Sequence, residues 1–295
     1  VARAASAFGA GGMVAISTAL IKDSYEGKEM SKVLSVTQAF MLIAPMLAPV
    51  LGAIILKVAD WKMTFIVLAI ITGVSLAGAF LLQETLPAKE RTQSTTIQTI
   101  LGLRKVAKNP NFSSLLLVGA FISAPFMAYL ALASYIYIDG FGVSETTFSM
   151  YFASNAATSI LGPVMYMRFG AGSVKKVINV GIIVAIISAI LILLVGNASP
   201  IIFLLSYVLY SIMTSYFRPL ISDLLLSATK TDVGATSSVM NFGFTVIGSI
   251  GMVVGSLQWS SYTGGLGITM LIFIALTMIV WLYLLKAKSI RFDWK

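Results

Sequence analysis

The sequence predicts an all-α, polytopic membrane protein. Hydrophobic residues make up 58% of the 295 positions and charged residues only 11%, whereas a soluble domain is usually about 45–50% apolar and about 25% charged. The mean hydropathy is +0.94, and the apolar residues gather in runs long enough to cross a bilayer as helices. With about 20 residues for each crossing, the length accommodates roughly nine transmembrane helices with short connections.

Nine apolar runs define the expected transmembrane helices in chain order. They lie at residues 1–21, 34–57, 62–83, 112–138, 146–167, 176–196, 200–226, 234–257 and 266–285. The connection after the third run is the one large polar interruption, and it separates three spans from six. We therefore divide the chain into the last three helices of an N-terminal bundle, a central cytoplasmic loop, a C-terminal six-helix bundle and a tail, at residues 1–86, 87–111, 112–287 and 288–295. Within the central loop, residues 96–110 predict either a short amphipathic surface helix or a flexible tether.

The basic residues fall mostly on one side of this topology. Sixteen of the twenty lysines and arginines occupy alternate connections and the tail, two occupy the other side, and Arg3 and Arg218 lie within spans. Because the cytoplasmic loops of membrane proteins are rich in lysine and arginine, we expect this side and the C-terminus in the cytoplasm. The net charge of +9 then reflects loop placement, and we expect no nucleic-acid partner. An odd number of spans leaves Val1 outside, so we also expect an upstream piece with an odd number of further spans.

Composition excludes several classes of enzyme. The chain contains neither cysteine nor histidine, which rules out disulfides, thiolate metal sites, cysteine nucleophiles and the commonest general base. The acidic residues are scattered mostly through the connections, without the clustering that a catalytic site needs. We therefore expect no enzyme activity, no metal and no cofactor.

The span around residues 39–56 combines helix-bending and close-packing features. Pro45 and Pro49 each remove a helical hydrogen bond, so the helix should bend here. A strip of small residues recurs every four positions, where another helix backbone can come close; it consists of Ala44, Ala48 and Gly52. The span is therefore either a kinked packing helix or a moving element.

Two of these helices resemble antiporters of the major facilitator superfamily. Residues 3–12, RAASAFGAGG, look like the fourth-helix motif, in which an arginine is followed six residues later by glycine. The following APMLAPVLGA is similar to the fifth-helix antiporter motif, in the double-proline form of the Bcr/CflA branch of drug:proton antiporters. The ETLP of residues 84–87 and residues 128–156 also resemble that branch. Further matches are the pairs Lys22–Asp23 and Asp60–Trp61, and departures are Ser6, Ala7, Ala53 and Tyr135.

The resemblance implies a major facilitator fold of twelve helices, whose first three precede this sequence. It implies a monomer in the inner (cytoplasmic) membrane that exports small lipophilic or cationic drugs in exchange for protons, by alternating access. It assigns proton coupling to Arg3 and conformational roles to Gly9, Asp23, Pro45, Pro49 and Gly52. The alternatives are a transporter of a sugar or other metabolite, and a fragment that transports nothing.

Candidates for the substrate cavity lie in the second half of the chain. Arg218 and Asp223 are charged residues of one span, either at the membrane interface or as a pair that lines the cavity and breaks when it opens inward. Aromatic and amide side chains suit lipophilic substrates. The predicted cavity residues are Phe126, Tyr129, Tyr135, Asn155, Arg218, Asp223 and Asn241, with Phe121, Phe148, Phe152 and Phe244 as further aromatic candidates. Gly251 and Gly255 predict close helix packing.

Overall fold

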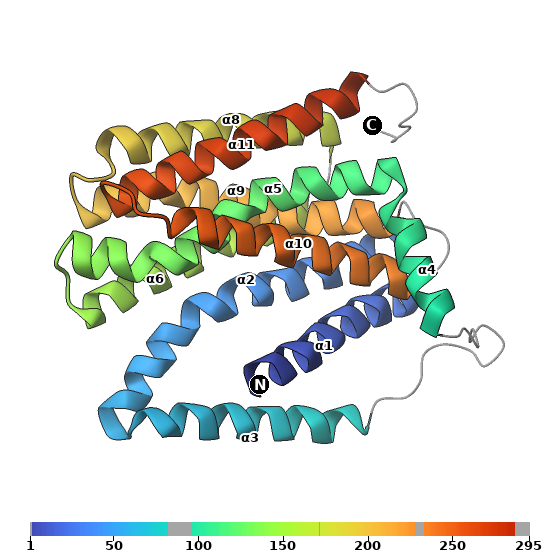
Figure 1. Ribbon diagram of the computed structural model, residues 1–295, viewed down its shortest axis with the longest axis horizontal. Helices are drawn as coiled ribbons and strands as arrows, with labels where there is room; N and C mark the ends of the chain where they lie inside the picture. Colours follow the sequence, from blue (N-terminus) through green and yellow to red (C-terminus); the bar gives the residue numbers. More distant parts are fainter. Residues whose placement is uncertain (1, 82–95, 171, 228–232, 287–295) are drawn as a thin grey trace.

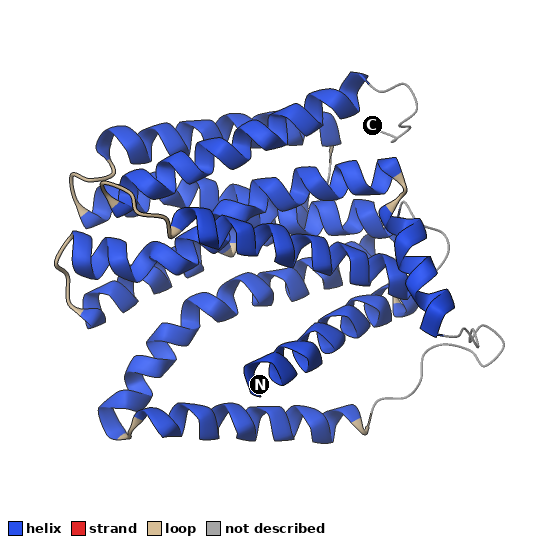
Figure 2. Ribbon diagram, in the orientation of Figure 1, coloured by secondary structure: helices blue, strands red, loops and turns tan. Residues whose placement is uncertain are grey.

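Helices account for all the regular secondary structure in the residues that the computed structural model describes, which are 2–81, 96–170, 172–227 and 233–286 (Figure 2). The predicted all-α class is therefore confirmed. Seven described segments are long and apolar enough to cross a membrane: Ala4–Ser24, Trp61–Ala79, Pro110–Gly140, Val174–Val195, Pro200–Ser227, Gly234–Gly255 and Tyr262–Lys286. The two predicted spans outside this set correspond to a long, bent helix and to a span divided in two, both described below.

The first three helices are α1 (Ala2–Ser24), α2 (Gly27–Val58) and α3 (Trp61–Ala79). Helix α2 continues through both prolines and is strongly bent in Figure 1, as the sequence predicts. Its first turns pack against the second half of the chain, where Met30, Leu34 and Ser35 are buried. Beyond the bend α2 leads away to α3, in which no residue is buried.

The chain then reaches α4 (Thr96–Ala107) and α5 (Pro110–Ser134). Helix α4 confirms a short helix within the central loop, and its Ile100 and Leu101 are exposed, as a helix lying on a membrane surface requires. Asn109 caps α5 by accepting hydrogen bonds from the backbone N–H groups of Asn111 and Phe112. A π-helical turn, η1 (Tyr135–Gly140), ends the span.

The fifth predicted span is divided into α6 (Glu145–Ser159) and α7 (Leu161–Phe169). Ile160 lies at the division, and its N–H bonds to the carbonyl of Ala157, three residues back. Pro163 has no N–H to donate to the carbonyl of Ser159, so the regular helical pattern is interrupted at this point. Gly170, with a φ of 65°, ends α7.

Four long helices complete the chain: α8 (Val174–Val195), α9 (Pro200–Ser227), α10 (Val233–Gly255) and α11 (Tyr262–Lys286). Together with α5 and α6 they enclose one hydrophobic core. The predicted close packing at Gly251 is confirmed, because a Cβ there would lie 2.5 Å from the carbonyl oxygen of Ala124. Helices α10 and α5 therefore touch backbone to backbone.

The two ends of the bundle differ in charge. The basic end, on the right of Figure 1, holds the end of α1, the beginning of α2 and all of α4. Its basic side chains include Lys22, Lys28, Lys32, Arg104, Lys105, Arg168 and Lys175. The opposite end holds the turns at residues 141–144, 196–199 and 256–261.

Several expected features lie outside the described residues. They are the ETLP of residues 84–87, Lys89, Arg91, Lys230 and the tail 288–295, together with the side chains of Arg3, Pro45, Pro49 and Ala53.

Candidate functional site

Asp223 joins three helices at the basic end. Its carboxylate accepts a hydrogen bond from the Ser31 hydroxyl of α2 at 2.5 Å and another from the Tyr166 hydroxyl of α7 at 2.7 Å. Both distances are in the range of hydrogen bonds to a charged carboxylate. Because Asp223 itself belongs to α9, this joint fastens the beginning of α2 to two helices of the C-terminal bundle.

A cavity of about 580 Å³ surrounds this joint. Lys28 and Lys32 of α2 and Arg168 of α7 line it together with Asp223. The carboxylate of Asp223 therefore lies in a cavity that three cationic residues also line. Close by, the ammonium of Lys22 donates to the backbone carbonyl of Leu226, so α1 is fastened to the end of α9 as well. Asp23, next to Lys22, is exposed.

Arg218 lies one turn and a half before Asp223 but contacts other groups. Its guanidinium carbon is 3.9 Å from the centre of the Phe244 ring on α10. A cavity of about 40 Å³ lies beside it, between α2, α5, α9 and α10. The lining residues are Met41, Ser123, Phe126, Met127, Thr214, Arg218, Phe244 and Gly248. Phe126 and Arg218, two of the predicted cavity residues, thus meet at one site.

Tyr129 belongs to an aromatic cluster in the core. Its ring stacks on that of Tyr207 of α9 with 4.0 Å between centroids, and on that of Phe152 of α6 with 5.5 Å. Tyr137 and Phe203 continue the cluster toward the opposite end, with 5.4 Å between their ring centroids. The hydroxyls of the three tyrosines in this cluster are all buried.

Asn155 is completely buried beside this cluster. It comes one turn after Phe152 and one turn before Ser159, whose hydroxyl bonds to that of Ser211 at 2.6 Å. Neither atom of the Asn155 amide group has a hydrogen-bond partner among the described residues. A buried polar group without a partner costs about 1–3 kcal/mol, so this amide is a candidate for contact with water or substrate.

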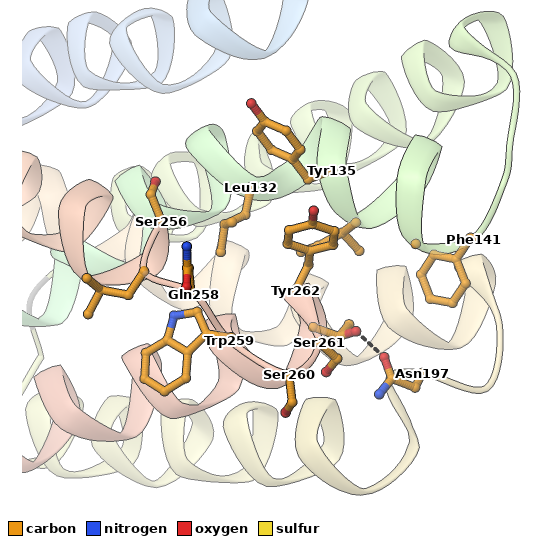
Figure 3. Close-up of a pocket in the computed structure, with 14 residues that line it drawn as sticks. Leu132, Tyr135, Phe141, Asn197, Ser256, Gln258, Trp259, Ser260, Ser261 and Tyr262 are labelled. Atoms are coloured by element: carbon orange, nitrogen blue, oxygen red, sulfur yellow. Dashed lines mark hydrogen bonds between the residues drawn. The ribbon is translucent and has the colours of Figure 1, made fainter.

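Tyr135 lies far from Asp223, at the opposite end of the bundle. It lines a pocket of about 780 Å³ between η1 and the residues that lead into α11 (Figure 3). Its ring centroid is 5.6 Å from that of Tyr262, and Trp259 lines the same pocket. The amide of Asn197 accepts a hydrogen bond from Thr263 at the pocket wall.

Three further predicted residues, Asn241, Gly9 and Gly52, line none of the cavities described above. Asn241 donates to the carbonyl of Ser237 in its own helix at 2.9 Å. Gly9 is exposed, and a Cβ at Gly9 or at Gly52 would meet nothing within 4 Å. Ala44 and Ala48 are exposed too, so the described part of the chain leaves the small-residue strip uncovered. Its packing role stays a prediction.

The structure adds site residues that sequence reasoning missed. Ser31, Tyr166 and Thr214 are single polar side chains of ordinary composition, and their roles depend on neighbours far away in the sequence. One signal was available for Thr214, because Tyr207, Ser211, Thr214, Arg218 and Ser222 recur at three- or four-residue spacing and so share a face of α9.

Comparisons with known proteins agree with this architecture. A model of the Major Facilitator Superfamily matches residues 1–252. The uncharacterized MFS-type transporter YdgK of Bacillus subtilis is 32% identical over 197 residues, which are 65% of this chain and 49% of the relative. The bicyclomycin resistance protein homolog of Haemophilus influenzae is 26% identical over 163 residues, 55% of this chain and 41% of the relative. The multidrug resistance protein MdtM of Salmonella typhimurium is 20% identical over 249 residues, 83% of this chain and 60% of the relative.

The chain spans about half the length of the curated relatives it matches. Among solved structures, the human organic anion transporter MFSD10 (TETRAN) superposes with a TM-score of 0.70 at 18% identity, over 91% of this chain and 67% of that chain. This likeness concerns the fold. With a family model that covers most of the sequence and a transporter fold of the same arrangement, the chain belongs to the Major Facilitator Superfamily.

Proposed function

We propose that the protein exports small lipophilic compounds across the cytoplasmic membrane in exchange for protons, by alternating access. The observation that carries the proposal is the asymmetry of α2. At the basic end, Ser31 ties α2 to Asp223, whereas beyond its bend α2 leads away from the C-terminal bundle (Figure 1). A helix that is fastened at one end and bent away at the other suits a protein that closes one side at a time.

The charge of the two ends supports an orientation of the bundle in the membrane. Most lysines and arginines of the described connections lie at the basic end, whereas Lys57 and Lys62 lie at the opposite end, and the positive-inside rule therefore supports a cytoplasmic position for the basic end. The conformation described here is then closed toward the cytoplasm. Relatives named as a bicyclomycin resistance protein homolog and a multidrug resistance protein support export of drug-like compounds.

Proton coupling is assigned to Arg3 on α1 by the resemblance of residues 3–12 to an antiporter motif. An arginine within a span is costly, at roughly 2.5–3.5 kcal/mol on insertion scales, and such residues commonly mark ion or proton pathways. Its fixed charge would favour the ionised form of a nearby carboxylate.

The test is proton movement in vesicles that contain the full-length protein. Rhodamine B is added on one side of the membrane, and a pH-sensitive dye reports protons on the other. We expect rhodamine B and protons to cross the membrane in opposite directions. In the Arg3→Ala variant, we expect no proton movement. If rhodamine B crosses the membrane equally fast with and without a proton gradient, the protein is a facilitator instead.

A further inference from the structure

We infer that Arg218 and Thr214 form a recognition site for an anionic group, so that the preferred substrates are lipophilic compounds carrying a carboxylate. This inference rests on the proposed transport function and adds the chemical class of the substrate. It differs from the sequence-based expectation, which included cationic drugs.

The cavity beside Arg218 lies between the two parts of the transporter. Met41 contributes from α2, and the remaining lining residues come from α5, α9 and α10 of the C-terminal bundle. Its volume is about 40 Å³, room for about three water-sized groups. A carboxylate has three heavy atoms, so the cavity accepts that head group while the body of the substrate stays outside it.

Phe244 holds the guanidinium of Arg218 in place. A separation of 3.9 Å between the guanidinium carbon and the ring centre places the cation over the ring face. The N–H groups of a guanidinium point outward in its own plane, where they bind a carboxylate through two parallel hydrogen bonds.

The position of Arg218 argues against a purely interfacial role. Nine residues separate it from the end of α9 at Ser227, a distance of about 13 Å along the helix axis. The side chain is half-buried and lies over Phe244 of the neighbouring helix. An arginine also stays charged at every pH that a cell meets.

Thr214 supplies a second donor to the same cavity. It precedes Arg218 by four residues, so the two side chains share a face of α9. Thr214 is 1% exposed, so its hydroxyl is buried at the wall of this cavity. A carboxylate in the cavity would accept hydrogen bonds from both residues. A cationic substrate would instead meet a fixed positive charge in surroundings of low dielectric constant, where repulsion is strong.

Binding of a matched pair of compounds tests this inference. Pyrenebutyrate and pyrenebutanol share a ring system and a chain, but only the first is an anion. Their binding to the full-length protein in lipid nanodiscs is followed by pyrene fluorescence, with empty nanodiscs as the background. We expect tighter binding of pyrenebutyrate. Arg218→Gln should weaken it at least about tenfold and leave pyrenebutanol unchanged.

Further variants distinguish the effect of losing a donor in the cavity from the effect of a disturbed fold. Arg218→Lys keeps the charge but loses the pair of parallel N–H donors. Its affinity for pyrenebutyrate should therefore lie between those of the wild type and Arg218→Gln. Thr214→Val keeps the shape of the side chain but removes the hydroxyl, and it should weaken the binding of pyrenebutyrate roughly threefold to tenfold. Arg104→Gln, on the surface helix α4, is the matched control and should change neither affinity.

Three outcomes overturn the inference: equal binding of the two compounds by the wild type, equal weakening of both by Arg218→Gln, or no effect of any variant at Arg218 and Thr214. The proposed transport function fails separately. It fails if the wild type moves no protons on addition of rhodamine B and none on addition of the uncharged pyrenebutanol, whichever pyrene compound binds more tightly.

Discussion

At the scale of single residues, the buried polar side chains of the C-terminal bundle divide into two kinds. Ser159 and Ser211 bond to each other, and the Tyr210 hydroxyl donates to the carbonyl of Ile122 on α5 at 2.5 Å. These groups hold helices together. The side-chain amide of Asn155 is equally buried but has no hydrogen-bond partner among the described residues, so no hydrogen bond within them accounts for its burial.

Opposite stability effects are expected from two neighbouring substitutions on α6. Asn155→Leu removes an unpartnered amide and should leave the free energy of unfolding unchanged or raise it by up to about 1–3 kcal/mol. Ser159→Ala leaves the hydroxyl of Ser211 without its partner. This substitution should lower the free energy of unfolding by about 1–3 kcal/mol. Reversible unfolding in detergent measures both. A larger loss for Asn155→Leu than for Ser159→Ala would mean that the amide is structurally bonded.

At the scale of elements, two glycines inside helices differ in whether a neighbouring helix packs closely against them. A Cβ at Gly251 would lie 2.5 Å from a backbone oxygen of α5, whereas one at Gly9 of α1 meets nothing within 4 Å. Both residues are inside helices, where alanine is otherwise favoured over glycine by about 1 kcal/mol.

The same substitution at these two glycines should therefore have opposite results. Gly251→Ala forces α10 away from α5 and should lower the free energy of unfolding by about 1–3 kcal/mol. Gly9→Ala should leave it unchanged or raise it slightly. If Gly9→Ala nevertheless abolishes proton-driven export, the motif on α1 acts in the transport cycle and not in folding. Equal unfolding curves for the two variants would contradict the backbone contact between α10 and α5.

The joint at Asp223 leads to a prediction about helix movement. Asp223→Asn removes the charge that strengthens the bonds from Ser31 and Tyr166, so the beginning of α2 should separate more often from α7. Because the chain contains no cysteine, spin labels can be attached at Glu26→Cys and Phe169→Cys alone. The distance distribution between them should shift to longer values.

Asp139→Asn is the matched control for this joint. Asp139 is an exposed carboxylate on η1, at the opposite end of the bundle. The same labels should report an unchanged distribution in this variant. An unchanged distribution in Asp223→Asn as well would show that the joint does not hold the basic end closed.

At the scale of the whole molecule, the apolar runs were enough to predict the helices. Every predicted span corresponds to a described helix or pair of helices, because crossing a bilayer requires about 20 apolar residues with internally satisfied backbone groups. The division at Ile160 was not predicted, since it depends on the single residue Pro163. The bend of α2 was predicted, because two prolines in one span leave few alternatives.

The candidate sites were less predictable than the helices. The residues expected to line one substrate cavity are distributed over different places: Tyr135 at the opposite end, Tyr129 and Asn155 in the aromatic core, and Arg218 beside Phe244. Helical spacing places Arg218 and Asp223 close together along α9, but it does not reveal which neighbouring helix each side chain meets. Their partners, Phe244 and Ser31, come from α10 and α2, and only the packing of those helices brings them together.

One measurement tests alternating access most directly, in the full-length protein within lipid vesicles. One label pair, Glu26→Cys with Phe169→Cys, spans the basic end, and a second, Val58→Cys with Glu145→Cys, spans the opposite end. We predict that a proton gradient with substrate changes the two distances in opposite directions, so that the first lengthens when the second shortens. Distances that stay constant, or that change in the same direction, would contradict the account.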